Sequence, residues 1–123
     1  SPDGSQMAYL SRDGNGIQQV FLMSPLGGEP IQLTSFEKPV QSGVRWHPNG
    51  THVCFIWNNS IIIANIQDGS WKQITKSTKL DTSALVWSQD GKTIGYNRNI
   101  QDEITGKSFA QVFALQLNQN LLP

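Results

Sequence analysis

Short apolar runs separated by polar turn residues form the main pattern of this chain. The runs are rich in β-branched and aromatic residues, as in Val53–Trp57 and Ile61–Ile63, and they end at Gly, Pro, Asn or Asp. No window repeats apolar residues at helical spacing. The pattern predicts ten strands, at residues 6–11, 18–24, 30–34, 43–46, 52–57, 60–66, 71–75, 84–87, 93–98 and 109–117.

One four-residue turn occurs three times. It reads Ser-Pro-Asp-Gly, His-Pro-Asn-Gly and Ser-Gln-Asp-Gly, at residues 1–4, 47–50 and 88–91, so the copies begin 46 and then 41 residues apart. Trp46 and Trp87 precede the second and third copies, and each lies twelve residues after a threonine, Thr34 or Thr75. A repeat of this length built from short strands is typical of a β-propeller. The predicted fold class is therefore all-β, with four-stranded antiparallel meanders as blades.

The repeat also predicts how the 123 residues are divided. We expect one partial propeller over 1–123, with a partial blade at 1–34, a complete blade at 40–75 and a partial blade at 82–123. Trp46 and Trp87 should be largely buried at equivalent positions between blades, and Trp57 and Trp71 should not be equivalent to them. Open blade edges would recruit protein partners or cause self-association. A self-sufficient small β-domain is the alternative.

Charge and cysteine content exclude several classes of function. Nine basic and nine acidic residues cancel, so nothing favours a nucleic-acid partner or an anionic membrane. The longest apolar run, Val53–Trp57, is far short of a membrane-spanning helix. Cys54 is the one cysteine, which rules out an internal disulfide and argues against a structural zinc site. We expect it to be a buried small apolar residue.

Candidate chemistry is sparse. There is no Gly-x-Ser-x-Gly nucleophile motif. His47 and His52 occupy repeat positions, where Ser, Gln or Thr stand in the other copies, so both are expected to be structural. The segment Asp13–Gly16 is faintly similar to a calcium loop but lacks the further acidic ligands, and a polar turn is expected instead. We therefore expect no catalytic residue, no cofactor and no metal.

Several stretches resemble the WD40-like (PD40) repeat of the TolB propeller family. These are residues 1–4, 7–11, 12–15, 20–23, 27–28 and 32–34, with looser matches in the later copies. In TolB, the periplasmic subunit of the Tol-Pal envelope system, such a propeller is a non-catalytic interaction platform. The resemblance thus implies a periplasmic scaffold for protein–protein interaction that is not an enzyme. Related propellers also accompany prolyl-oligopeptidase-like peptidases and form some oligogalacturonate lyases, and these remain the alternatives.

Alternate loops of an antiparallel meander fall on the same side of the molecule. Loops 12–17, 35–42, 58–59, 76–83 and 99–108 should share one face, opposite the repeated turns and the hairpins near 25–29 and 67–70. The first set carries the length variation and much of the charge, and variable loops on a rigid scaffold are where binding usually resides. The candidate interaction residues are Arg12, Asp13, Glu37, Lys38, Asp81, Asp102, Glu103 and Lys107.

Overall fold

The computed structural model describes residues 1–76, 82–118 and 122–123 and contains ten strands there. They are β1 (Met7–Arg12), β2 (Gln18–Met23), β3 (Ile31–Gln32), β4 (Val40–Trp46), β5 (His52–Trp57), β6 (Ser60–Asn65), β7 (Trp71–Gln73), β8 (Thr82–Trp87), β9 (Thr93–Gln101) and β10 (Ser108–Gln116). No helix in this part of the chain is long and apolar enough to cross a membrane. Every strand expected from the sequence is present, and the all-β prediction is confirmed.

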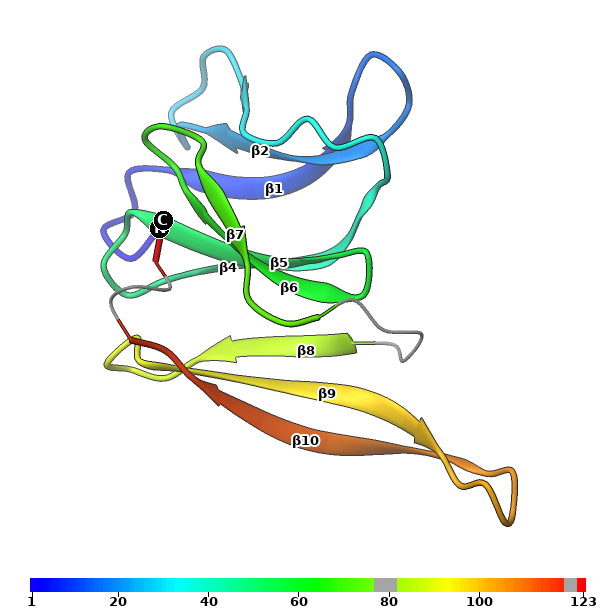
Figure 1. The fold of residues 1–123 in the computed structure, drawn as a ribbon. Coiled ribbons are helices and arrows are strands. Elements are labelled where there is room, and N and C mark those ends of the chain that lie inside the picture. The colour runs from blue at the N-terminus through cyan, green and yellow to red at the C-terminus, as the bar shows by residue number, and fades with distance from the viewer. Residues whose placement is uncertain (77–81, 119–121) are drawn as a thin grey trace.

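The strands form three antiparallel sheets that follow one another along the chain. Their orders are β1-β2-β3, β4-β5-β6-β7 and β8-β9-β10, so each strand pairs with its neighbour in sequence. Figure 1 shows the three sheets stacked in chain order. The middle sheet has the four strands predicted between about 43 and 75, with β5 paired to β4 on one side and β6 on the other. The predicted meander is confirmed.

The middle sheet is buried on both faces, which explains its uninterrupted apolar runs. Along β5, Val53 and Phe55 pack toward the first sheet, and Cys54 and Ile56 pack toward the third. Successive strand residues point to opposite faces, so a strand with neighbours on both sides needs apolar residues at every position. Cys54 is fully buried, as expected, and burial raises the pKa of its thiol to about 12.

Trp46 and Trp87 occupy the positions that the repeat predicts. Trp46 pairs with Val53 and packs on the core between the first and second sheets, and Trp87 pairs with Ile94 and packs on the core between the second and third. Their equivalence is confirmed, and Trp57 and Trp71 lie elsewhere in the pairing. Trp46 and Trp87 are each mostly buried, as expected, but neither is fully enclosed.

The three repeated turns have the same geometry. In each, the glycine N–H donates to the carbonyl of the first residue at 3.0 Å, from Gly4 to Ser1, Gly50 to His47 and Gly91 to Ser88. The glycine φ angles are 76°, 74° and 71°, a left-handed conformation that favours glycine. The sequence motif therefore specifies one local structure three times.

Two strands begin earlier than expected because each contains a bulge. The β4–β5 and β8–β9 pairings shift register near Gly43 and Ala84, which have φ of 67° and 57°. A bulge inserts an unpaired residue and lets pairing resume beyond it. The outer strands β3 and β7 are shorter than expected, since beyond them the hydroxyls of Thr34 and Thr75 accept the N–H groups of β2 and β6 at 3.0 Å.

Candidate interaction surface

The described loops that vary in length lie at one end of the three sheets, as the topology predicts. Most of the predicted loop 76–83 lies outside the residues that the structure describes. In Figure 1 the β1–β2, β5–β6 and β9–β10 connections lie on the right, and the three repeated turns with the β2–β3 and β6–β7 hairpins lie on the left. We call residues 12–17, 33–39, 58–59 and 101–107 the variable-loop end. The β5–β6 turn at Asn58 and Asn59 has φ of 52° and 54°, the two left-handed residues of a tight two-residue hairpin turn.

Asp13 organises the β1–β2 loop. Its carboxylate accepts the N–H groups of Asn15 and Ile17 at 2.9 and 3.0 Å and the side-chain amide of Gln19 at 3.2 Å. The hydrogen bond from Ile17 is the main reason that the pKa of Asp13 lies below its ordinary value. The loop is the polar turn expected from the sequence, and this carboxylate is engaged within it.

Gln19 connects this loop to the linker between the first two sheets. Its buried side chain accepts the hydroxyl of Thr34 at 2.7 Å and donates to the carbonyl of Phe36 at 2.8 Å. The linker is thereby held beside the β1–β2 loop, and a hollow of about 310 Å³ lies between them, lined partly by Asp13 and Glu37. Buried polar side chains with all their partners in place hold such segments in one geometry.

The eight candidate interaction residues fall into separate groups. Asp13 and Glu37 border the same hollow, and Arg12 borders a second hollow. Lys38 follows Glu37 in the linker, and the Lys38 carbonyl accepts the indole N–H of Trp57 at 3.0 Å. Arg12, Glu37 and Lys38 are exposed. Asp81 lies outside the residues that the structure describes. The remaining candidates lie on another hairpin.

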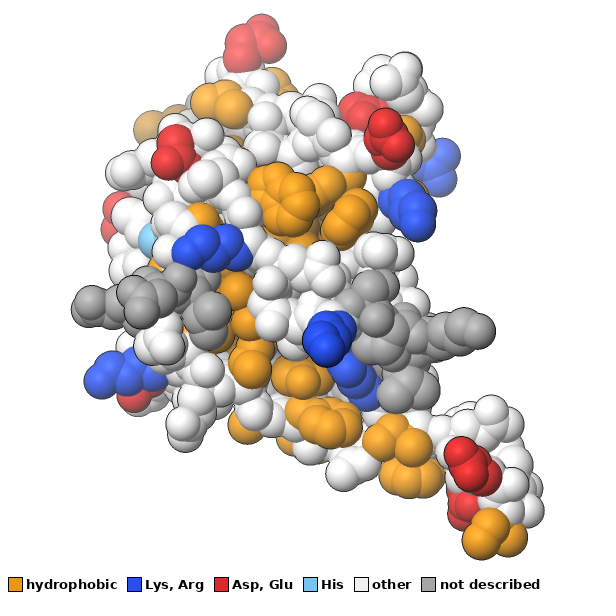
Figure 2. All heavy atoms as spheres, viewed as in Figure 1, with side chains coloured by type: hydrophobic (Ala, Val, Ile, Leu, Met, Phe, Trp, Pro, Cys, Tyr) orange, Lys and Arg blue, Asp and Glu red, His pale blue; other side chains and the backbone are white. Residues whose placement is uncertain are grey.

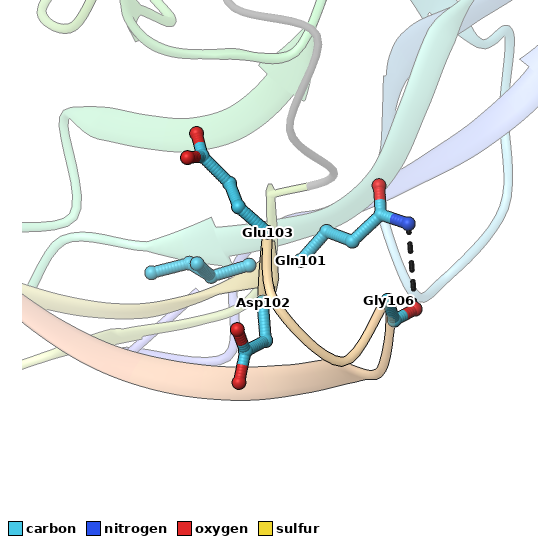
Figure 3. A pocket seen from close by; sticks show the side chains of 5 residues that line it. Gln101, Asp102, Glu103 and Gly106 are labelled. Atoms are coloured by element: carbon cyan, nitrogen blue, oxygen red, sulfur yellow. Dashed lines mark hydrogen bonds between the residues drawn. The ribbon is translucent and has the colours of Figure 1, made fainter.

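Asp102, Glu103 and Lys107 lie on the β9–β10 hairpin, which projects beyond the other loops at the lower right of Figure 1. A hollow of about 440 Å³ lies under its tip, lined partly by Asp102 and Glu103, whose carboxylates point in opposite directions in Figure 3. The N–H of Ile104 donates to Asp102 at 2.8 Å and is the main cause of that residue's lowered pKa. Asp102 therefore shapes the turn, and Glu103 faces solvent.

Apolar side chains of the linker, of β5 and β7, and of the projecting hairpin were not among the candidate residues predicted from charge. Phe36 stacks on Trp57 with ring centroids 4.5 Å apart and meets the edge of Trp71 at 5.0 Å, and Trp71 keeps 46% of its surface exposed. On the projecting hairpin Ile104 is 95% exposed and Phe109 51%. Figure 2 shows apolar surface over the sheets and at the tip of this hairpin. The one signal in the sequence that could have indicated such residues was an isolated aromatic or aliphatic residue within a polar loop.

Comparison with known proteins agrees with this architecture. No protein-family model matches the chain. TolB from Acinetobacter baumannii superposes with a TM-score of 0.65 at 24% identity, over 89% of this chain and 30% of that one. The chain has a β-propeller fold. An oligogalacturonate lyase from Vibrio parahaemolyticus superposes with a TM-score of 0.73 at 11% identity, over 94% of this chain and 35% of that one.

The propeller also has a curated relative in sequence. Uncharacterized protein YidR of Escherichia coli (strain K12) is 39% identical over 107 residues, which cover 85% of this chain and 26% of YidR. The chain thus spans about a quarter of the length of that relative and about a third of each of the two solved propellers. The likeness to the solved structures concerns the fold.

The two histidines lie at the opposite end of the propeller and hold turns together. The Nδ1 atom of His47 accepts the N–H of Asn49 at 2.9 Å, so its Nε2 carries the proton and donates to the carbonyl of Gly91 at 3.0 Å. This bond joins the turns of the second and third sheets. Burial is the main reason that the pKa of His47 lies below its ordinary value. No group of three or more metal-ligating side chains lies together in residues 1–76, 82–118 and 122–123.

Proposed function

We propose that this propeller segment serves as a non-catalytic surface for protein–protein interaction. The observation that carries the proposal is the projecting β9–β10 hairpin. Its tip presents Ile104, which is 95% exposed, and Phe109, which is half exposed, next to the charged side chains of Glu103 and Lys107. Exposed apolar residues rimmed by charge on a rigid support are typical of a protein contact.

The state of the titratable groups supports a scaffold over a catalyst. The carboxylates of Asp13 and Asp102 accept backbone N–H groups of their own turns, and that of Asp90 accepts the hydroxyl of Ser88 and the N–H of Lys92. These bonds lower the three pKa values, and His47 links two turns as a neutral imidazole. Catalytic acids and bases instead need pKa values near the working pH and a free approach to substrate. These groups are better suited to shaping the propeller than to proton transfer.

The resemblance to TolB-type repeats adds a location to the proposal. If the parent protein acts as TolB does, it works in the periplasm as an interaction platform. Separation of periplasmic from cytoplasmic contents, followed by detection of the protein with an antibody, tests this directly. Recovery in the cytoplasmic fraction alone would contradict a TolB-like role.

A photo-crosslinking experiment tests the interaction surface. A photoreactive amino acid is placed at Ile104 and, as a matched control, at Leu26, which is 99% exposed on a hairpin at the opposite end. We expect crosslinks to a separate polypeptide from Ile104 and not from Leu26. Substituting Phe109 by Asp should weaken the crosslinks from Ile104, because it removes apolar contact area from the same hairpin.

Two results would contradict the proposal. Equal crosslinking from both positions would mean that the hairpin has no special role in contact. Crosslinks from Ile104 only to a hydrolase or lyase domain of the same polypeptide would favour the alternative, an accessory propeller that serves a linked enzyme.

A further inference from the structure

Asparagine followed by glycine occurs twice in the sequence, at Asn15-Gly16 and at Asn49-Gly50. Gly16 has φ of 78° and Gly50 of 74°, and each donates its N–H to the carbonyl three residues earlier at 3.0 Å. Both asparagines are exposed. The two pairs therefore have one local backbone structure, and they differ in what surrounds the asparagine side chain.

The side chain of Asn49 is held at both ends of its amide. Its Oδ1 atom accepts the N–H of Thr51 at 2.9 Å, and its Nδ2 atom donates to Nδ1 of His52 at 3.2 Å. His52 is only 7% exposed, so this partner is itself fixed. A Cβ placed on Gly50 would lie 3.9 Å from Cδ of Pro2. The amide of Asn49 is thus anchored beside occupied space.

The side chain of Asn15 has no such anchor. Nothing in the described part of the chain forms a hydrogen bond with its side-chain amide. Only the backbone N–H of Asn15 is engaged, by the carboxylate of Asp13 at 2.9 Å. A Cβ placed on Gly16 would meet nothing within 4 Å. The Asn15 side chain is therefore free to rotate, and the space beside Gly16 is open.

We infer that Asn15 is a site of spontaneous deamidation in the folded protein and that Asn49 is protected. The backbone nitrogen of Gly16 attacks Cγ of Asn15 and forms a new C–N bond. The side-chain nitrogen leaves as ammonia and takes the proton of the Gly16 N–H, which leaves a five-membered succinimide ring. Water then opens the ring at either carbonyl carbon, so the product is aspartate or isoaspartate. Glycine favours the attack because no Cβ crowds its nitrogen.

The difference in anchoring sets the difference in rate. Ring closure requires the asparagine side chain to rotate until Cγ reaches the next backbone nitrogen. Asn49 must break two side-chain hydrogen bonds to do so, and Asn15 breaks none. The bond from the glycine N–H to the turn carbonyl must break in both pairs, so it cancels in the comparison. Each side-chain bond slows the reaction about 2–12-fold, so Asn15 should react at least about fivefold faster.

Deamidation of Asn15 changes the variable-loop end in charge and in shape. It places a second carboxylate two residues from Asp13, which holds this loop by accepting the N–H of Ile17 at 3.0 Å. In the isoaspartate product the main chain also gains one carbon between residues 15 and 16, which displaces the Ile17 N–H from that carboxylate. Asn15 lines the hollow of about 310 Å³ beside the linker, so the hollow changes with it.

Peptide mapping by mass spectrometry tests the inference. The purified chain is kept at neutral pH and sampled over time, and replacement of the amide by a carboxyl group raises the mass by about one dalton. Trypsin cleaves after Arg45, so the two pairs fall in separate peptides. The same measurement in denaturant gives the intrinsic ratio of the two rates. We expect the ratio of Asn15 to Asn49 to be at least about fivefold higher in the folded chain than in the unfolded chain.

Two variants assign the effect to the named groups. Asn15→Gln should remove the mass gain from its peptide, because a glutamine cannot form the five-membered ring. His52→Thr introduces the residue found at this position of the third repeat, Thr93, and should accelerate reaction at Asn49 about 2–12-fold by removing one anchor. Far-ultraviolet circular dichroism of both variants should match the unchanged chain.

Hydrogen exchange gives a readout of the altered loop. The amide of Ile17 should exchange faster in the isoaspartate form, because it loses its acceptor on Asp13. Equal rate ratios in the folded and unfolded chain would overturn the inference. A folded chain in which Asn15 stays unmodified while the unfolded chain reacts would also overturn it, as would faster reaction at Asn49 than at Asn15.

Discussion

Ala84 adopts a backbone conformation that costs free energy, and its equivalent in the preceding repeat is a glycine. Ala84 has φ of 57° and Gly43 has φ of 67°, and both lie at the bulge of the strand that opens a sheet. They are 41 residues apart, the same spacing as the second and third turns. We predict that Ala84→Gly stabilises the fold and that Gly43→Ala destabilises it.

Two opposing terms set the magnitude. A left-handed conformation costs a residue with a Cβ roughly 1–2 kcal/mol. Replacing Ala by Gly also favours the unfolded chain by about 0.4–1 kcal/mol, because glycine has more unfolded conformations. The net gain for Ala84→Gly is then about 0.5–1 kcal/mol, and the net loss for Gly43→Ala is about the same. A Cβ at Gly43 meets nothing within 4 Å, and Ala84 is exposed, so packing adds little to either value.

Chemical denaturation measures both free energies of unfolding. The midpoint should shift in opposite directions for the two variants without a change in slope, since neither alters the surface exposed on unfolding. Ala110→Gly is the matched control, because Ala110 is an exposed strand residue whose φ is not positive. It should lose about 0.5–1 kcal/mol. If Ala84→Gly destabilises the fold as much as Ala110→Gly does, the argument from backbone strain is wrong.

Three further predictions concern side chains that join the sheets. Trp87→Ala should lower the free energy of unfolding by about 2–4 kcal/mol in a denaturant titration, since the partly buried ring packs on the core between two sheets. A loss under 1 kcal/mol would show that the ring does not contribute to that core. Thr34→Val should lower the free energy of unfolding by about 1–3 kcal/mol, because the buried side-chain oxygen of Gln19 loses the hydroxyl that donates to it. Hydrogen exchange of the Val20 amide should also accelerate, because that N–H loses its acceptor. The pKa of folded His47 lies below its ordinary value of 6.5, mainly through burial, so the unfolded chain binds a proton first as the pH falls. Stability should therefore decrease from about pH 6.5 downward, and His47→Ser should flatten that part of the profile; an unchanged profile would contradict the assignment.

Local sequence was sufficient to predict the elements. The alternation of apolar runs and turn residues indicated all ten strands, with errors of up to three residues at their ends. The repeated turn was predictable because a glycine after Asp or Asn specifies a single left-handed position, whatever the surroundings. The start of β4 was missed by three residues and that of β8 by two, because each strand contains a bulge and nothing in the residues themselves marks Ala84 as left-handed. The end of β9 was also missed by three residues.

The candidate site was predictable in outline only. The meander topology correctly assigned the variable loops to one end. It could not indicate that Asp13 and Asp102 are engaged with their own backbones, nor that Phe36 joins Trp57 and Trp71 in a cluster. The bonds of Asp13 and Asp102 depend on the geometry of their own turns. The aromatic cluster depends on how the linker between two sheets folds back, which is decided by packing between segments far apart in the chain.

The sequence by itself determined the strands, the turns and the repeat, because each depends on side-chain alternation and backbone preferences within a few residues. The tertiary structure alone decided which faces are covered. Met7 and Val53 occupy the same place in their repeats, yet one is 44% exposed and the other fully buried. Burial depends on whether another sheet lies across that face, and a local pattern carries no record of that neighbour.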